Sequence, residues 1–240
     1  MSRRILITGA AGYIGSQLAR QLQQHHYVVG VDIRKDESAD FPFYQMDIRD
    51  PKIGALMKEH GIHQVVHLAA VLEDSGDRAR DFDIDVNGTR NVLDACVASG
   101  ATQLVVTSSG AAYGYYADNP AWLDEQDPLR GNPEFPYSDH KRQVEELLAD
   151  YREKYPALKQ LVLRPGTVLG ADTRNLIPVF SRGNGCWPWP VRRRRLFLSG
   201  IRMWWVLSSR ESIRIVAVAS IWPEMAPCPL IRWATCWASR

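Results

Sequence analysis

Hydrophobic residues along the first 180 positions alternate between short apolar runs and longer stretches with helical spacing. Six apolar runs predict β-strands, at residues 5–8, 27–31, 43–46, 64–68, 103–107 and 159–163. Leu18 and Leu22 mark a helix between the first two runs. The stretches Val86–Ser99 and Tyr137–Tyr155 mark two more helices, the second of which ends before Pro156. This alternation predicts an α/β protein with a doubly wound parallel sheet and helices on both faces.

The first predicted strand is followed by three glycines with the spacing G-x-x-G-x-x-G. Gly9 permits a tight turn, Gly12 allows the backbone to approach a pyrophosphate, and Gly15 allows the next helix to pack against the strand. Amides at the start of that helix would then face the phosphates. The segment predicts a Rossmann-type dinucleotide-binding turn. A glycine motif alone also fits ordinary turns, so the prediction depends on the second strand and the residue at its end.

An acidic residue, Asp32, stands at the end of the second predicted strand, about 20 residues beyond the glycines, where a carboxylate can bind both hydroxyls of an adenosine ribose. The alternative is a solvated carboxylate in a loop, which the position at a strand end disfavours. A carboxylate at this position repels the 2′-phosphate of NADP, so the predicted cofactor is NAD. Arg34 is close enough to leave NADP open.

Tyr137 and Lys141 lie one turn apart on the same face of the last predicted helix. A tyrosine with a pKa of about 10 is a poor base at neutral pH, but a nearby cation lowers that pKa. Tyr-x-x-x-Lys also arises by chance, as a solvated lysine beside an aromatic ring. Ser109, just beyond the fifth strand, could hold a substrate oxygen, and it favours the catalytic interpretation.

Other sequence features narrow the class of protein. The four cysteines show no regular spacing, and His63 and His67 flank a predicted strand, where their spacing does not bring them together, so neither disulfides nor a metal site are predicted. The sequence has no long apolar stretch and no room for a signal peptide before the first strand. We therefore expect a cytoplasmic protein that binds a small-molecule substrate, with no membrane or nucleic-acid partner.

Residues 3–180 resemble the extended short-chain dehydrogenase/reductase family, in particular its NAD-dependent sugar-nucleotide epimerases and dehydratases. The motifs that carry the resemblance are TGAAGYIG (8–15), VD (31–32), MDIRD (46–50), HLAA (67–70), DVNGTRNVLDA (85–95), SSGAAYG (108–114), YSDHK (137–141) and LRPGTVLG (163–170). The cofactor-binding residues that the resemblance implies are Gly9, Gly12, Tyr13, Ile14, Gly15, Asp32, Asp47, Ile48, Leu68, Ala69, Ala70, Asn87, Tyr137, Lys141 and Pro165. Among these, Asp47 binds near the adenine and Asn87 helps to hold the strand ends.

The resemblance also implies catalytic roles. Tyr137 donates or accepts the proton, Ser109 polarises the reacting oxygen, and Lys141 lowers the pKa of Tyr137 and binds ribose. The implied reaction is hydride transfer at a secondary alcohol of a sugar nucleotide or similar compound, by an epimerase, dehydratase or dehydrogenase. Family members often form homodimers through the two long helices. A non-catalytic NAD-binding sensor or regulatory protein is the alternative, which the complete set of three residues disfavours.

The composition changes abruptly at Ser181. Residues 181–240 hold 10 Arg and 2 Glu, seven of the eight Trp, and no Lys, Asp, His, Gln or Tyr, whereas the first 180 residues have a net charge of −6. The tail shows neither strand alternation nor a helical period. We expect an NAD-binding domain at 1–180 and an aberrant tail at 181–240, so that the C-terminal substrate lobe is incomplete.

A shifted reading frame would explain this tail. Because Met and Trp have single codons, reading Arg202–Val206 one nucleotide earlier must give Val-Val-Gly, preceded by Asp, Asn, His or Tyr. The same shift allows Leu-Ala-Gly-Asp-Gly at 221–226. Both strings resemble segments of the family's late helix and last strand, which places the shift near Ser181–Asn184. The alternatives are a nucleic-acid-binding arm at Arg192–Arg195 and a membrane-surface segment at Trp204 and Trp205.

Overall fold

The computed structural model describes residues 2–72, 74–120, 123–169, 198–200, 202–207 and 213–218. The chain divides into two units, Met1–Pro165 and Gly166–Arg240, which are considered separately. The proposed frame change near Ser181–Asn184, the arginine run and Cys186, Cys228 and Cys236 lie outside the described residues. None of the described helices is long and apolar enough to cross a membrane.

A six-stranded sheet forms the centre of the first unit. Its strands are β1 (Arg4–Thr8), β2 (Tyr27–Asp32), β3 (Phe43–Gln45), β4 (Gln64–His67), β5 (Gln103–Thr107) and β6 (Lys159–Leu163). Their order is β3-β2-β1-β4-β5-β6, and every neighbouring pair is parallel. The six predicted strands are confirmed, with ends that differ by one residue at most. This order reverses direction between β1 and β4, and ligands of such sheets bind outside the carboxyl ends of the strands at that point.

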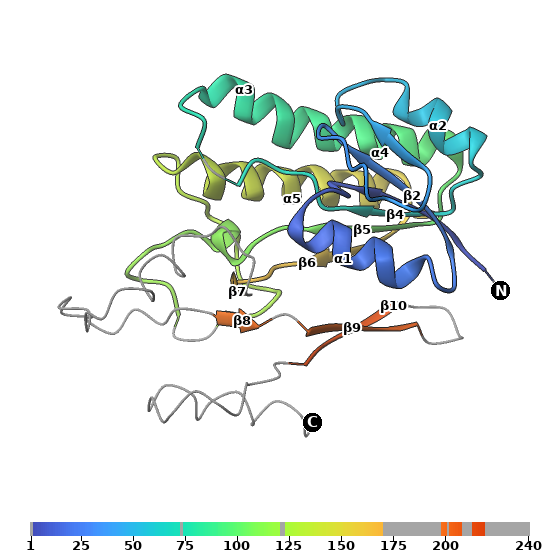
Figure 1. Ribbon diagram of the computed structural model, residues 1–240. Coiled ribbons are helices and arrows are strands. Elements are labelled where there is room, and N and C mark those ends of the chain that lie inside the picture. The colour runs from blue at the N-terminus through green and yellow to red at the C-terminus, as the bar shows by residue number, and fades with distance from the viewer. Residues whose placement is uncertain are drawn as a thin grey trace. The chain divides into compact units, whose positions relative to one another are not determined.

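Helices cover both faces of this sheet (Figure 1). They are α1 (Tyr13–Leu22), α2 (Ile53–Glu59), α3 (Arg78–Phe82), α4 (Gly88–Ser99) and α5 (Pro136–Lys154). One buried core joins alternate strand residues, such as Leu6 and Val65, to α2, α4 and α5. The residues between them, such as Ile7 and Val66, are also buried and point to the opposite face, where α1 packs on β1 and β2. Each central strand is therefore apolar on both sides, as the continuous apolar runs predict.

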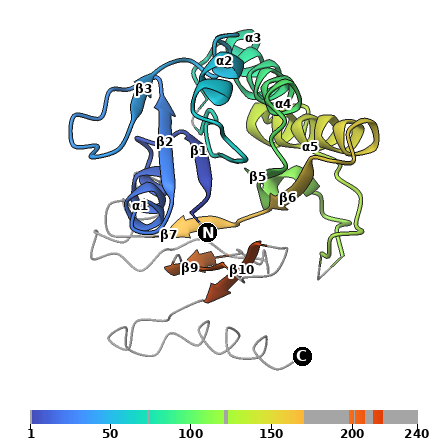
Figure 2. The same cartoon turned by 90° about the vertical axis from the view of Figure 1, so that its right-hand side faces the viewer.

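The helix predicted at Val86–Ser99 begins earlier than expected. Helical backbone starts at Arg78, where the Asp77 carboxylate caps the helix by accepting the Arg80 amide at 3.0 Å. It continues through a π-helical segment, Asp83–Asn87, into α4. The sequence pattern misses this start because polar residues dominate the first turns. Helices α4 and α5 lie side by side over one face of the sheet (Figure 2).

The second unit contains four described strands. β7 (Thr167–Leu169) pairs in parallel with β8 (Leu198–Gly200), and β9 (Arg202–Leu207) pairs antiparallel with β10 (Ile213–Val218). Three of these strands lie within residues 181–240, although that segment shows no strand alternation in its sequence. Their tryptophan, isoleucine and valine residues have high strand propensity, which supports pairing without regular alternation.

Candidate functional site

The glycine-rich turn after β1 packs closely against the segment that follows β4. Gly9 has a φ of +72°, and a Cβ atom at this position would lie 2.8 Å from the amide nitrogen of Ala69. The Gly12 amide donates to the Gly9 carbonyl at 3.0 Å, and Gly12 is the N-cap of α1. Tyr13 and Ile14 follow in the first turn of α1, half-buried. The turn thus presents the start of a ten-residue helix, which suits a phosphate group.

The segment after β4 runs beside this turn. The Leu68 amide donates to the Thr8 carbonyl at 3.1 Å, and Leu68, Ala69 and Ala70 are half-buried. The predicted cofactor residues of the first and fourth strands therefore meet at the carboxyl ends of β1 and β4, at the crevice of the sheet.

Asp32 is buried, with 6% of its surface exposed. Its Oδ2 atom accepts the Ala11 amide at 3.0 Å, and its Oδ1 atom accepts the Arg34 amide at 2.9 Å. The carboxylate is therefore fixed against the glycine-rich turn, which excludes the solvated-loop interpretation. Among the described residues, Oδ2 accepts only the bond from Ala11, and it can accept another from a ribose hydroxyl, so the ribose contact fits this geometry. The Arg34 side chain is 63% exposed, with Nε 3.4 Å from Asp32 Oδ1.

Asp47 and Ile48 lie beyond β3. Three groups of Arg49 bind the Asp47 carboxylate: the amide at 2.9 Å, Nε at 3.0 Å and Nη2 at 2.6 Å. The hydrogen bonds from the Arg49 side chain hold the pKa of Asp47 below its usual value. Ile48 is buried, and a Cβ atom at Gly88 would lie 2.6 Å from its Cδ1 atom, so this loop packs tightly on α4.

The three predicted catalytic residues lie together. Ser109 is the N-cap of the 3₁₀ turn η2 (Gly110–Tyr113), and its Oγ accepts the Ala111 amide at 3.1 Å. Tyr137 stands in the first turn of α5, close enough to Ser109 for that side chain to lower the pKa of the phenol. The buried Lys141 Nζ donates to the Thr107 carbonyl at 3.2 Å and lies 5.6 Å from the centre of the Tyr137 ring.

The electrostatics of this group differ from the expectation that Lys141 lowers the pKa of Tyr137. Burial instead raises the pKa of Tyr137, the Ser109 side chain opposes that rise, and the Asp85 charge adds to it. Burial lowers the pKa of Lys141, against the attraction of Asp85 and Glu145. The protein on its own therefore stabilises a protonated phenol at neutral pH, which suits a proton donor.

Asp85 and His140 are functional candidates that the sequence analysis missed. Asp85 Oδ1 accepts the Val71 amide at 2.8 Å, Oδ2 lies 3.2 Å from His140 Nδ1, and both side chains are 2% exposed. Asp85 thus fixes the segment after β4, the role expected of Asn87. The exposed Asn87 amide instead donates to Asp83 at 2.9 Å. Pro165 follows β6, and its carbonyl accepts the Gly110 amide at 3.0 Å.

A chain of hydrogen bonds crosses the buried space between β1, β4 and α4. The Thr89 hydroxyl donates to the Asp85 carbonyl at 2.5 Å, so its oxygen must accept from His67 Nε2 at 3.0 Å. His67 Nδ1 then accepts from the Thr8 hydroxyl at 2.7 Å. These bonds fix a neutral imidazole with its proton on Nε2. Burial, with the Lys141 charge, lowers the pKa of His67 to about 3.

The neutral His67 predicts acid destabilisation. Because the folded pKa of about 3 lies below the unfolded value of 6.5, the unfolded chain binds the extra proton between these values. The contribution of His67 to the free energy of unfolding has its full value above pH 6.5. It falls as the pH decreases toward 3, and about 2 kcal/mol is lost at pH 5. Urea unfolding of the parent and of His67→Gln at pH 7.5 and 5 measures this loss. Between pH 7.5 and 5, the free energy of unfolding of His67→Gln should fall by about 2 kcal/mol less than that of the parent. That of His63→Gln, a substitution at an exposed position, should fall as much as that of the parent. Equal losses in all three proteins would contradict the assignment.

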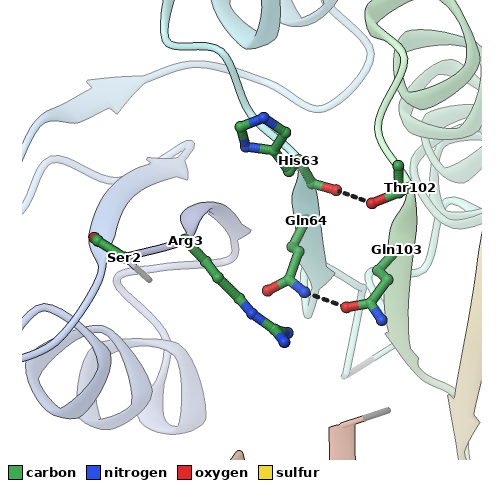
Figure 3. A pocket seen from close by; sticks show the side chains of 6 residues that line it. All are labelled: Ser2, Arg3, His63, Gln64, Thr102 and Gln103. Carbon is green, nitrogen blue, oxygen red and sulfur yellow. Dashed lines mark hydrogen bonds between the residues drawn. The ribbon is translucent and has the colours of Figure 1, made fainter. Parts of the chain in front are cut away.

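A separate cavity of about 260 Å³ lies at the amino ends of β1, β4 and β5 (Figure 3). It is lined by Ser2, Arg3, His63, Gln64, Thr102 and Gln103. The Gln64 and Gln103 amides bond to each other, and Thr102 Oγ1 donates to the His63 carbonyl at 3.3 Å. This cavity is at the opposite edge from the carboxyl ends, so it does not belong to the candidate site.

The chain is similar to known sugar-nucleotide epimerases. UDP-glucose 4-epimerase of Neisseria meningitidis serogroup C is 29% identical over 192 residues, covering 73% of this chain and 56% of that protein. UDP-glucose 4-epimerase 2 of Oryza sativa is 35% identical over 191 residues, covering 70% and 45%. A crystal structure of UDP-glucose-4-epimerase from Stenotrophomonas maltophila, with bound NAD and formylated UDP-arabinopyranose, has a TM-score of 0.64 and 33% identity, covering 73% of this chain and 60% of that one.

The family model "NAD dependent epimerase/dehydratase family" matches residues 5–183. This match and the solved structure with bound NAD confirm the predicted fold and the predicted cofactor, NAD. The chain spans about half the length of these curated relatives. The chain therefore belongs to the NAD-dependent epimerase/dehydratase family.

Proposed function

We propose that this chain carries the NAD-binding part of an NAD-dependent UDP-sugar 4-epimerase. The observation that carries the proposal is that Ser109, Tyr137 and Lys141 lie together at the carboxyl end of β5, on the edge of the sheet that also holds the glycine-rich turn. The relatives are UDP-glucose 4-epimerases, which favours epimerisation over dehydration or net oxidation. NAD, when bound, supplies the hydride acceptor.

The residues of this chain would carry out proton transfer, polarise the reacting oxygen and bind the cofactor. Tyr137 exchanges the proton of the reacting hydroxyl, and the Ser109 hydroxyl polarises the same oxygen. Lys141 would bind the nicotinamide ribose, and Asp32 would bind the adenosine ribose. The complete set of three catalytic residues, together with enzymes as relatives, leaves the sensor alternative less supported.

We propose further that residues 181–240 result from a shifted reading frame and replace the substrate lobe of the family. The family match ends at residue 183, within the segment where the composition changes. The loss of that lobe would leave the site open, so we expect weakened NAD binding and little turnover in the chain as written. We also propose that the protein forms a homodimer through α4 and α5.

Sequencing the coding DNA from the codon of Leu176 past that of Arg240 tests the frame. One inserted or deleted base that restores Asp-Val-Val-Gly and Leu-Ala-Gly-Asp-Gly is the expected result, and the repaired protein should interconvert UDP-glucose and UDP-galactose. A confirmed frame, with NAD bound but no NADH signal across a panel of sugar nucleotides and alcohols, would instead support the sensor.

A further inference from the structure

A partly buried ion pair lies next to the three catalytic residues and has no role in the proposed mechanism. Arg164 follows β6, and Glu145 lies on α5. Arg164 Nε is 2.8 Å and 3.0 Å from the two carboxylate oxygens of Glu145, and Nη2 is 2.5 Å from Oε2. The side chains are 21% and 5% exposed, respectively. Such a two-pronged arrangement fixes the orientation of both groups.

Both members of the pair hold a further residue near the catalytic group. The Ser108 hydroxyl donates to Glu145 Oε1 at 2.5 Å. Arg164 Nη1 donates to Tyr113 Oη at 2.6 Å, and the Tyr113 hydroxyl donates to the Asp124 carbonyl at 2.7 Å. The pair therefore joins α5 to the end of β6, to the residue after β5 and to η2.

These attachments flank the two segments that meet at the reacting oxygen. Ser108 precedes Ser109 in the chain, and Glu145 lies one helical turn beyond Lys141 and two turns beyond Tyr137. On the strand side, the carbonyl of Pro165, the residue after Arg164, accepts the Gly110 amide at 3.0 Å. Movement of the ion pair would therefore change the separation between the Ser109 hydroxyl and the Tyr137 phenol.

We propose that Glu145 and Arg164 are positioning residues that hold the Ser109 hydroxyl beside the phenol of Tyr137. Neither residue touches the reacting atoms. The inference rests on the proposed function, because it assigns the pair to the same catalytic group. An ion pair of this kind is weak evidence for stability, since apolar residues often replace it without loss, whereas its fixed geometry serves orientation.

Nuclear magnetic resonance of protein labelled at tyrosine ¹³Cζ tests the proposal without turnover. The Tyr137 signal is assigned with Tyr137→Phe, and Ser109→Ala defines the shift caused by loss of the Ser109 hydroxyl. Glu145→Gln and Arg164→Gln should each reproduce most of that shift at neutral pH. The double variant should do the same, and it removes the unpaired buried charge that could unfold a single variant. Circular dichroism verifies folding.

The control is the neighbouring ion pair on the same helix. Glu146 Oε1 is 2.5 Å from Arg142 Nη1, and its side chain is 58% exposed, so Glu146→Gln should leave the Tyr137 signal unchanged. A folded double variant with an unshifted Tyr137 signal would overturn the proposal and assign the pair a structural role. A shift as expected, in a repaired enzyme whose turnover survives Tyr137→Phe, would uphold the positioning role and refute the proposed function.

Discussion

Replacing Tyr137 by phenylalanine is expected to lower the kcat of the frame-repaired enzyme by about 10²- to 10⁴-fold, the range for loss of one acid–base group. The phenol is the group that can exchange a proton with an oxygen held by Ser109, because Tyr137 lies close enough to Ser109 for the serine to influence the pKa of the phenol. Phenylalanine keeps the ring, which is packed against Phe135 with centroids 6.0 Å apart, so the fold should survive. Conversion of UDP-galactose, followed by coupled NADH formation, measures the loss.

The matched control is Tyr155→Phe, at the other end of α5, where the side chain is 40% exposed. That variant should retain the parental kcat. Calorimetric titration should also show the NAD dissociation constant of Tyr137→Phe within a few-fold of the parental value, because the glycine-rich turn and Asp32 are intact. Equal turnover in Tyr137→Phe and the parent would remove Tyr137 from the mechanism.

The raised pKa of Tyr137 changes how the catalytic group is understood. The sequence spacing predicts a phenolate stabilised by Lys141, but the lysine ammonium donates to Thr107 and is itself destabilised by burial. Asp85, buried nearby, adds negative charge that opposes ionisation of the phenol. The protein thus provides a proton donor ready at neutral pH, and a positively charged ligand in the site would be needed to favour the phenolate.

The sheet could be predicted from the sequence because each central strand is apolar on both faces. Ile7 and its neighbour Leu6 pack on opposite sides of the sheet, so the run needs no alternation and stands out against polar loops. The glycine-rich turn could be predicted for a similar reason. A positive φ at Gly9 and backbone contacts at Gly15 impose a requirement that only glycine meets.

The contacts within the candidate site could not be predicted, because they depend on helix register and on pairs distant in sequence. The π-helical segment shifts the faces of the helix, which turns Asp85 toward Val71 and His140. Likewise, the ion pair of Glu145 with Arg164 joins residues 19 positions apart through the end of a strand. In the sequence, Asp85 and Glu145 look like ordinary polar residues on a solvated helix face, and Arg164 looks like an ordinary polar residue after a strand.

Substituting alanine for Gly15 should unfold or distort the dinucleotide-binding turn. The new Cβ atom would lie 2.1 Å from the Gly9 carbonyl oxygen and 2.9 Å from the Cα atom of Ala10. Both atoms belong to the backbone, so no side chain can rotate to relieve the clash, and α1 must move away from β1. We expect the free energy of unfolding to fall by about 1–3 kcal/mol or more, as overpacking of a core does. NAD affinity should fall at least about tenfold, since a misplaced helix start costs more than about 1.4 kcal/mol of binding.

Gly54 provides the control because it also lies within a helix, α2, yet its added Cβ atom would meet nothing closer than 3.7 Å, at the Cβ atom of Ala95. Gly54→Ala should therefore stabilise the protein by about 0.5–1 kcal/mol, the usual gain in helix propensity, and leave NAD binding unchanged. Urea unfolding and calorimetric titration of the two variants separate helix propensity from the steric requirement of the turn. If Gly15→Ala matched Gly54→Ala in both measurements, the close contact between α1 and the Gly9 turn would not exist in solution, and the assignment of this turn as the phosphate-binding site would lose its geometric basis.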